Sequence, residues 1–514
     1  MKISKNAVFY NTIMLIATNI SAQFIFFGYR IFLSRMIGAE GMGVYQLIFP
    51  FYFVLVSLTF SGLCMAVTRL SAERQALHDK SGIYNTVRYC IWIFVLIFAV
   101  VAIPSAMFSK EIAIFALGDE RTALSILILL PCIFFTGFEN IFKSCFYGMK
   151  KITPPIFAEI TEQLTRFGTA AFLLICFPTK NIAIMVAYIV CGMLIAEIAS
   201  SFLLMLFYRK HMPCPVNTDK NNFKMFKSIA DIALPVSAAG LLNNLLSSAN
   251  IILLPRRLVF SGMAQSDALS LFGVIIGMLL PLIMLPSPFI TSLSTILMPK
   301  ISEGSALKNA ADIKRKTAKA IHAVSLFAFP SSTLLIVLAP LACQLLYKQT
   351  VSPLLIIPAA AAAIFVYFQI ITCSILNGIG QQRKVAVITV IGGVMQLVLT
   401  YFAAGSKYLG IYGYLLGFLV STVFMSLYSF ILIVKKTKVK INWTGWFIIP
   451  ILSSAICGLT AYPVLLLSVH SGIQKWLALI LSGLSGAAVY YIIVRFQGLS
   501  IKRYLSTLIT KKTD

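Results

Sequence analysis

The sequence has 514 residues, of which 59% are hydrophobic and 11% are charged, and its formal net charge is +26. This balance excludes a soluble globular protein and predicts an all-α polytopic membrane protein, because only a bilayer can solvate so much apolar surface. The ten cysteines are scattered, with no Cys-x-x-Cys pair and no Cys/His ligand spacing. We therefore expect no metal site and no cofactor.

The first apolar segment carries a polar stripe. Polar residues recur along it at steps of seven, four, seven and four: Thr12, Asn19, Gln23, Arg30 and Ser34. At about 100° per residue these steps place all five on one face of a helix. A membrane helix does not turn such a face to lipid, so Arg30, Asn19 and Gln23 are candidate cavity residues. The alternative is that Arg30 snorkels to the interface, because it lies near the end of the helix.

Apolar windows of about 20 residues, the length that crosses a bilayer, recur along the whole chain. Fourteen can be placed, at 9–34, 44–68, 87–108, 122–146, 155–177, 182–208, 229–255, 268–298, 318–340, 353–376, 384–404, 409–434, 445–469 and 473–494. Thirty of the 42 Lys and Arg residues fall in the tails and in every second connection, and nine fall in the others. The positive-inside rule then predicts a multi-pass membrane protein with both termini cytoplasmic. We expect the basic surface to attract anionic membrane lipids and see no nucleic-acid motif behind it.

The two halves of the chain show a weak internal repeat. Similar residues recur at offsets of 224 to 233: Asn19 with Asn243, Gly43-Val44 with Gly273-Val274, Pro131 with Pro358, Gly148 with Gly378, and Gln163-Leu164 with Gln396-Leu397. Each copy holds six helices, an even number, so we expect two parallel lobes related by an axis along the membrane normal. The predicted organisation is an N-lobe at 1–222, a C-lobe at 223–436, and helices thirteen and fourteen with a basic tail at 437–514.

Charged residues also fall inside the expected membrane helices. The acidic ones are Glu139, Glu159, Glu162 and Glu197. The fifth helix places four polar residues on one face: Glu159, Glu162, Gln163 and Arg166. Glu162 and Arg166 have the i,i+4 spacing of an ion pair, and Glu139 and Lys143 on the fourth helix have the same spacing. Two hypotheses stand: the pairs neutralise themselves and hold helices together, or they form a hydrated wall that meets an ionic substrate or a coupling ion.

The seventh helix repeats the polar theme of the first. Its polar residues recur at steps of four, three and seven: Asn243, Ser247, Asn250 and Arg257. We take Asn243, Asn250 and Arg257 as candidate cavity residues, with snorkelling as the alternative for Arg257. The eighth helix contains Pro281, Pro286 and Pro288. These prolines predict either a helix broken around a binding site or a packing kink.

Three stretches carry a family resemblance: IGAEGMGVYQLIFPFYF (Ile37–Phe53), EQLTR (Glu162–Arg166) and ITSLSTILMPKISEG (Ile290–Gly304). They resemble the stage V sporulation protein B group, in the polysaccharide-transport and mouse-virulence-factor branches of the multidrug/oligosaccharidyl-lipid/polysaccharide exporter superfamily. The resemblance covers nearly the whole chain. It implies a fold of fourteen helices in two six-helix lobes plus two C-terminal helices. It also implies flipping of an undecaprenyl-pyrophosphate-linked glycan, such as a peptidoglycan or spore-cortex precursor.

Lipid II flippases of this superfamily use arginines in a central cavity. Arg30 matches one such position after the FGYR of the first helix. Where those flippases carry further arginines, this chain has Gln23 and no arginine in Phe51–Leu63. The resemblance thus implies the flippase class without assigning lipid II.

The leading hypothesis from the sequence is a flippase for a polyprenyl-pyrophosphate-linked glycan, driven by a coupling cation or by the membrane potential. A pyrophosphate needs a cationic path, and Arg is its bidentate ligand. The alternative is a cation-coupled multidrug antiporter of the same superfamily, which the intramembrane carboxylates favour. A polytopic glycosyltransferase is disfavoured, because the outside loops are too short to hold a catalytic site, so we expect no enzyme.

Overall fold

The computed structural model describes residues 5–211 and 222–496, with side chains described from 21 to 211 and from 225 to 496. Within these ranges every regular element is a helix, which confirms the predicted all-α class. The chain separates into two compact units, one of Met1–Arg256 with Met263–Gly273 and one of Arg257–Gly262 with Val274–Asp514. Each unit is described by itself, and the lobe boundaries expected from the repeat remain a prediction.

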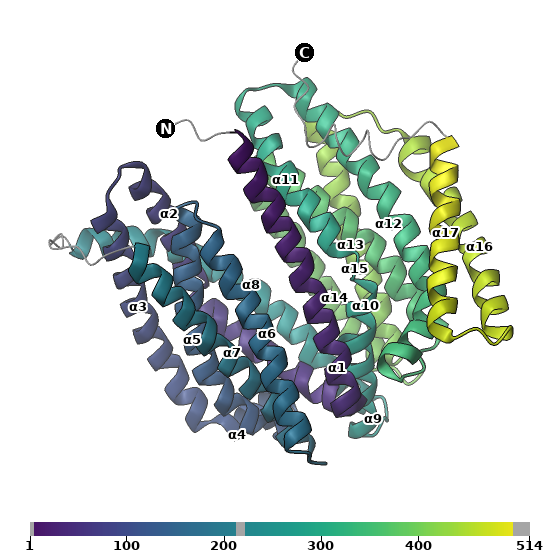
Figure 1. Ribbon diagram of the computed structural model, residues 1–514, viewed down its shortest axis with the longest axis horizontal. Coiled ribbons are helices and arrows are strands. Elements are labelled where there is room, and N and C mark those ends of the chain that lie inside the picture. Colours follow the sequence, from purple (N-terminus) through teal and green to yellow (C-terminus); the bar gives the residue numbers. More distant parts are fainter. Residues whose placement is uncertain (1–4, 212–221, 497–514) are drawn as a thin grey trace. The chain divides into compact units, whose positions relative to one another are not determined.

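The first unit contains the helices drawn from purple to teal in Figure 1. They are α1 (Lys5–Thr59), α2 (Ser61–Ala76), α3 (Lys80–Met107), α4 (Ser109–Glu111), a π-helix (Ile112–Leu117), a 3-10 turn (Glu120–Thr122), α5 (Ala123–Gly148), α6 (Thr153–Cys176), α7 (Ile182–His211), most of α8 (Asn222–Phe260) and α9 (Gln265–Phe272).

The second unit contains the remaining helices, from teal to yellow. They are a π-helix (Gly273–Leu279), α10 (Leu280–Ile283), α11 (Ser287–Ala306), α12 (Ala310–Tyr347), α13 (Pro353–Gly378), α14 (Gln382–Ala404), α15 (Ile411–Thr437), a π-helix (Thr444–Ile448), α16 (Ile449–His470) and α17 (Lys475–Phe496).

Helix α1 is two membrane helices joined without a loop. Its backbone departs from helical geometry at Gly38, where φ is 70° and ψ is −173°. Only glycine adopts that conformation readily, because any Cβ would crowd the neighbouring backbone. The second half runs to Thr59 and continues, after a break at Phe60, into α2. The sequence predicts a glycine-rich loop between the windows at 9–34 and 44–68, and the structure has a sharp bend there instead.

The helix predicted at 268–298 is interrupted. Helix α9, the π-helix from Gly273 and α10 follow one another without a break. The chain then turns at Met284–Pro286, and α11 begins at Ser287. In that turn the amides of Leu285 and Ser287 donate to the carbonyls of Leu282 and Met284. The helix is thus broken next to its prolines, and a binding site at this break stays a prediction.

The number of membrane helices agrees with the sequence. Twelve described segments are long and apolar enough to cross a bilayer. One of them, Ser21–Thr59, contains the bend at Gly38 and so accounts for two crossings. Helix α6 is not among the twelve because it carries three charged residues. With α6 included, the described helices account for fourteen membrane crossings.

The internal repeat appears as a reciprocal contact. A Cβ on Gly43 would lie 2.2 Å from the carbonyl oxygen of Leu269, and a Cβ on Gly273 would lie 2.1 Å from the carbonyl oxygen of Ala39. Gly43 and Gly273 are related by the repeat, and so are Ala39 and Leu269 at the same offset. Two contacts that exchange partners in this way are what a two-fold axis between the copies produces. The contact supports the parallel pseudo-symmetry of the fold.

The last two helices are an addition to the second repeat. Within the second unit, α16 and α17 pack on each other and on α12. The Ser482 hydroxyl donates to the carbonyl of Ala461 at 2.6 Å, and the Tyr490 hydroxyl donates to the carbonyl of Leu326 at 2.8 Å. Small side chains and hydroxyls thus hold this pair, as is usual between membrane helices.

Candidate functional site

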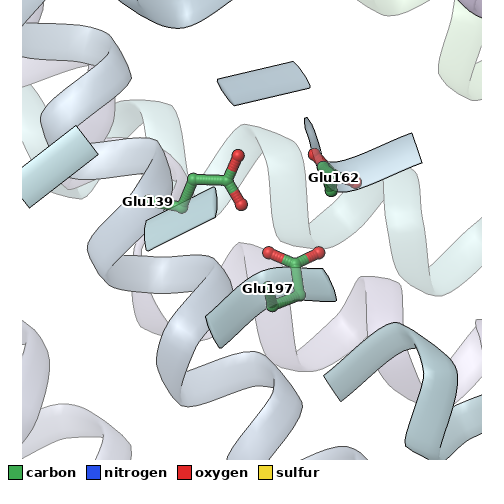
Figure 2. Close-up of side chains that lie close together, drawn as sticks. All are labelled: Glu139, Glu162 and Glu197. Carbon is green, nitrogen blue, oxygen red and sulfur yellow. The ribbon is translucent and has the colours of Figure 1, made fainter. Parts of the chain in front are cut away.

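Three consecutive helices of the first unit, α5, α6 and α7, pack side by side and each contributes one buried carboxylate. Glu139 comes from α5, Glu162 from α6 and Glu197 from α7, and they are 1%, 9% and 3% exposed. Helix α6 can start next to them because Pro154 and Pro155 occupy its first turn, where their missing amides cost no hydrogen bond. Figure 2 shows the three carboxyl groups pointing toward one another.

Two basic side chains join the carboxylates into one ion network, defined here as Glu139, Lys143, Glu162, Arg166 and Glu197. The Lys143 Nζ lies 2.6 Å from Glu139 Oε1 and 3.4 Å from Glu162 Oε2. The Arg166 Nη2 lies 2.5 Å from Glu162 Oε1 and 3.3 Å from Glu197 Oε1. Glu162 is thus the central member, and the network links all three helices.

Burial makes this network costly in free energy to form and to disrupt. All five side chains are at most 15% exposed, so water contributes little to their solvation. Ion pairs at such sites roughly repay the desolvation of their members, but removing one partner typically costs about 3–5 kcal/mol because the other charge is left buried. Charged residues that are buried inside membrane helices despite this free-energy cost are candidates for a functional role.

The carboxylates could also hold a cation. One oxygen from each of Glu139, Glu162 and Glu197 can be chosen so that all three lie within 4.8 Å of one another. Sequence spacing predicted no metal site, because the three residues are far apart in the chain and come together only through helix packing. What such a group can bind depends on which oxygens the basic residues leave open.

Aromatic residues of α1 cover one side of the network. The Tyr29 and Phe32 rings contact the ring of Phe167, which follows Arg166 on α6, at centroid distances of 5.8 and 5.5 Å. Tyr29 and Tyr45 are 2% and 3% exposed and lie within electrostatic range of Arg166. The first helix therefore places two buried phenols beside the network.

The stripe predicted on α1 lies beside this contact. Arg30 is half-buried, with its guanidinium 5.2 Å from the centre of the Phe26 ring, and Gln23 is also half-buried. The Ser34 hydroxyl is turned back to the carbonyl of its own helix at Ile31. The side chain of Asn19 lies outside the described residues. Neither Arg30 nor Gln23 belongs to the ion network, and their role in a cavity stays a prediction.

The other predicted site residues are dispersed. Glu159 and Gln163 are half-buried on α6, outside the network, and Asn243 is exposed on α8. Asn250 is buried and donates from Nδ2 to the carbonyl of Leu246 at 3.0 Å.

Arg257, in the second unit, is held by aromatic rings. Its guanidinium carbon lies 4.3 Å from the centre of the Phe260 ring and 4.1 Å from that of Tyr401. This arrangement stabilises a cation without a carboxylate. Of the ten residues predicted from sequence, the network brings together Glu162 and Arg166.

Sequence reasoning did not include Glu139, Lys143 and Glu197 among the site residues. The first two carried a signal, the i,i+4 spacing inside an apolar helix. Glu197 carried a weaker one, an acid in a membrane helix with no basic residue at pairing distance along the chain. Such a residue must find its partner on another helix, and here the partner is Arg166.

The chain is similar to proteins of known kind over most of its length. Residues 8–305 match the family described as "Polysaccharide biosynthesis protein". "Stage V sporulation protein B" of Bacillus subtilis (strain 168) is 24% identical over 454 residues, covering 85% of this chain and 86% of the relative.

Two solved structures share the fold. The structure "Lipid II flippase MurJ, inward closed conformation" superposes with a TM-score of 0.70 at 15% identity, covering 94% of this chain and 98% of that one. The inward-facing structure of a multidrug resistance MATE family transporter of the MOP superfamily gives a TM-score of 0.68 at 15% identity, covering 82% and 99%. At this identity the two structures show the fold alone.

Proposed function

Because this chain belongs to the polysaccharide biosynthesis protein family, whose match spans residues 8–305, we propose that it flips a polyprenyl-pyrophosphate-linked glycan across the cytoplasmic membrane by alternating access. The family and the fold make it a multi-span membrane transporter and not an enzyme. The substrate class, the membrane and the direction of transport belong to the proposal.

The observation that carries the proposal is a membrane-buried network of five charges in a chain of this family. Apolar cargo needs no such network, whereas a transporter for an anionic, hydrated head group needs fixed charges to solvate it or to couple its movement to an ion. The similarity to a sporulation protein and the fold of a lipid II flippase support a glycan-lipid substrate.

We further propose that Arg30 contacts the pyrophosphate. The network's Arg166 is already shared between Glu162 and Glu197, so its donors face carboxylates. Arg30 is half-buried on the polar face of α1, with its guanidinium 5.2 Å from the centre of the Phe26 ring. Guanidinium binds a phosphate through two parallel hydrogen bonds, which lysine cannot reproduce.

The experiment is glycan-lipid flipping in proteoliposomes, with a panel of undecaprenyl-pyrophosphate-linked glycans and undecaprenyl phosphate as the control lipid. We expect the wild type to flip at least one pyrophosphate-linked glycan. Arg30→Lys should weaken flipping and Arg30→Ala should abolish it, since a point charge cannot replace the bidentate fork. Neither change should unfold the protein.

The matched control is Arg35→Ala, an exposed arginine about one and a half turns further along the same helix. It should flip glycan lipid at the wild-type rate. If Arg30→Lys also flips at the wild-type rate, Arg30 only snorkels, because lysine snorkels equally well. Wild-type flipping by Arg30→Ala would remove Arg30 from the substrate path altogether.

A second candidate function is cation-coupled multidrug antiport. It is favoured by the carboxylates buried in the network and by the likeness to a multidrug transporter structure. Its test is uptake of a cationic dye into inverted vesicles. Dye uptake abolished by Glu139→Gln or Glu197→Gln, together with no glycan flipping, would replace the flippase proposal.

A further inference from the structure

The ion network leaves two carboxylate oxygens without a partner. Four of its six carboxylate oxygens face a cation, namely both oxygens of Glu162 and the Oε1 atoms of Glu139 and Glu197. The remaining two, Glu139 Oε2 and Glu197 Oε2, are buried, and the one hydroxyl near them in the described part of the chain is that of Ser200, which lies within reach of Glu139 and donates to the carbonyl of Glu197. The side chains that carry them are 1% and 4% exposed, so bulk water does not satisfy them.

The network also has an unbalanced charge. Three carboxylates face two cations, Lys143 and Arg166, which leaves one excess negative charge. Arg30 of α1 acts electrostatically on Tyr45, beyond the first shell of the network, and the other titratable groups described around the network add no positive charge. They are Tyr29, Tyr45 and Tyr52 from α1, Cys132 and Tyr147 from α5, and Glu159 from α6. An uncompensated charge in a membrane interior costs several kcal/mol, so one positive charge is missing from this site.

The two open oxygens belong to carboxyl groups that face each other. Figure 2 shows Glu139 and Glu197 directed into the same space, and their side chains are within hydrogen-bonding reach. Two carboxylates within hydrogen-bonding distance repel each other when both are ionised, and one proton shared between them removes this repulsion. A shared proton would satisfy both open oxygens and neutralise the excess charge.

A metal ion fits the same space poorly. Hard cations such as Ca²⁺ and Mg²⁺ take about six or more oxygen ligands, and the basic residues leave two. A divalent ion would also turn the excess of one negative charge into an excess of one positive charge. Lys143 Nζ and Arg166 Nη2, which lie within 3.4 Å of the carboxylates, would repel it.

We propose that Glu139 and Glu197 bind one proton between them and that this proton is exchanged with water during the transport cycle. The step adds or removes one H⁺ and breaks no other bond: the protonated network is neutral, and release returns it to one negative charge. The binding of the proton stands independently of the substrate. Its use to drive transport rests on the glycan-lipid flippase function proposed above.

The binding experiment is an infrared titration of the purified full-length protein in detergent. The signal is the C=O stretch of a protonated carboxyl group, which is separate from the carboxylate stretches. We expect one such band in the wild type that disappears as pH rises. Glu197→Gln and Glu139→Gln should each lack it, because either change removes the excess charge and one half of the pair. Glu111→Gln, an exposed residue of α4, should keep it.

These variants are expected to fold, because Gln is isosteric with a protonated Glu and leaves two carboxylates facing two cations. A band that persists in both Glu139→Gln and Glu197→Gln, or no band in the wild type, would overturn the site. Replacing K⁺ with Na⁺ at constant pH should leave the band unchanged. Loss of the band on adding Na⁺ would mean that the site takes a sodium ion in place of the proton.

The coupling experiment uses proteoliposomes with a pH gradient and no membrane potential. If one proton moves per glycan lipid, one pH unit should shift the transbilayer ratio of the lipid by about tenfold. Glu197→Gln should show no shift, and Glu111→Gln should behave as the wild type. If the protein shows the C=O band but flips no glycan lipid, the flippase function is contradicted and the proton site is not. Flipping whose pH dependence survives Glu197→Gln would contradict this inference alone.

Discussion

Glu162 is the residue on which the buried charges depend most. Its two carboxylate oxygens face two different cations, Lys143 of the preceding helix and Arg166 one turn along its own. Arg166 in turn faces Glu197 of the next helix. The network is therefore not a simple i,i+4 pair, and its members should respond unequally to substitution.

The first prediction follows from counting charges. Glu162→Gln leaves two carboxylates with two cations, whereas Arg166→Gln leaves three carboxylates with Lys143 alone. We expect Arg166→Gln to destabilise strongly, on the order of 3–5 kcal/mol, and Glu162→Gln to be much milder. Thermal unfolding of the purified variants measures this. The double variant keeps two carboxylates, Glu139 and Glu197, and one cation, Lys143, which is the same excess of one negative charge as in the wild type. Its stability should therefore recover most of the loss caused by Arg166→Gln alone.

Flipping by the double variant separates structure from substrate contact. If Arg166 only balances Glu162 and Glu197, the stable double variant should flip glycan lipid. If Arg166 also meets the substrate, the double variant should be stable and inactive. Equal damage from the two single changes would show that Glu162 and Arg166 form an isolated pair, contrary to the geometry described.

For single residues, the sequence predicts ion pairs within one helix and does not predict ion pairs between helices. The spacing of Glu162 with Arg166, and of Glu139 with Lys143, is enough to predict each pair, because residues four apart share a helix face. The Lys143–Glu162 and Arg166–Glu197 contacts depend on how α5, α6 and α7 are rotated about their axes. A single sequence of apolar helices does not determine that rotation, since nearly every face is apolar.

Among the elements, α1 shows best what one residue does to a helix. The sequence predicts a loop around Gly38, and the structure instead joins two helices there directly, through a glycine with φ of 70°. No atom lies within 4 Å of where a Cβ on Gly38 would stand. The requirement for glycine is therefore conformational and not steric.

The second prediction is that Gly38→Ala destabilises the protein by about 1–3 kcal/mol, the usual cost of forcing a Cβ into such a backbone conformation. Gly28→Ala is the matched control on the same helix. No atom lies within 4 Å of a Cβ there either, and its backbone is helical, so Ala should be neutral or stabilising by about 0.5–1 kcal/mol. Thermal unfolding of both variants measures the difference. Equal stability of the two would mean that the bend does not need glycine.

The helices themselves follow from the sequence with few exceptions. Long apolar windows identify the membrane helices because nothing else explains so many consecutive apolar residues. The differences lie at the second and eighth helices, which the structure divides at Phe60 and at Met284–Pro286. Proline at the second break gives a signal, whereas Phe60 gives none.

For the whole molecule, the internal repeat indicates how the two copies are related, and the distribution of Lys and Arg indicates the orientation in the membrane. The reciprocal Gly43 and Gly273 contacts relate the repeats through one axis. The charge distribution predicts the sides of the membrane, which the fold alone does not.

The third prediction concerns those sides. With both termini cytoplasmic, a cysteine placed between Arg209 and Lys227 should be protected from impermeant thiol reagents in intact cells. One placed beside Lys348 should be labelled. The background needs Cys176 replaced, the exposed member of the cysteines described, and Cys214, which lies in the tested segment. Labelling in the opposite pattern would reverse the membrane orientation and the proposed direction of flipping.

The charges of α6 have a consequence for how the protein is made. Each charged residue near the middle of a helix disfavours entry into the bilayer by about 2.5–3.5 kcal/mol, and α6 carries Glu159, Glu162 and Arg166. Alone, this segment would partition unfavourably from the translocon into lipid. Its ion partners, however, are on α5, synthesised just before it, and on α7, synthesised just after it. We therefore expect the three helices to enter the bilayer as one group, with α6 waiting at the translocon until Glu197 has emerged from the ribosome.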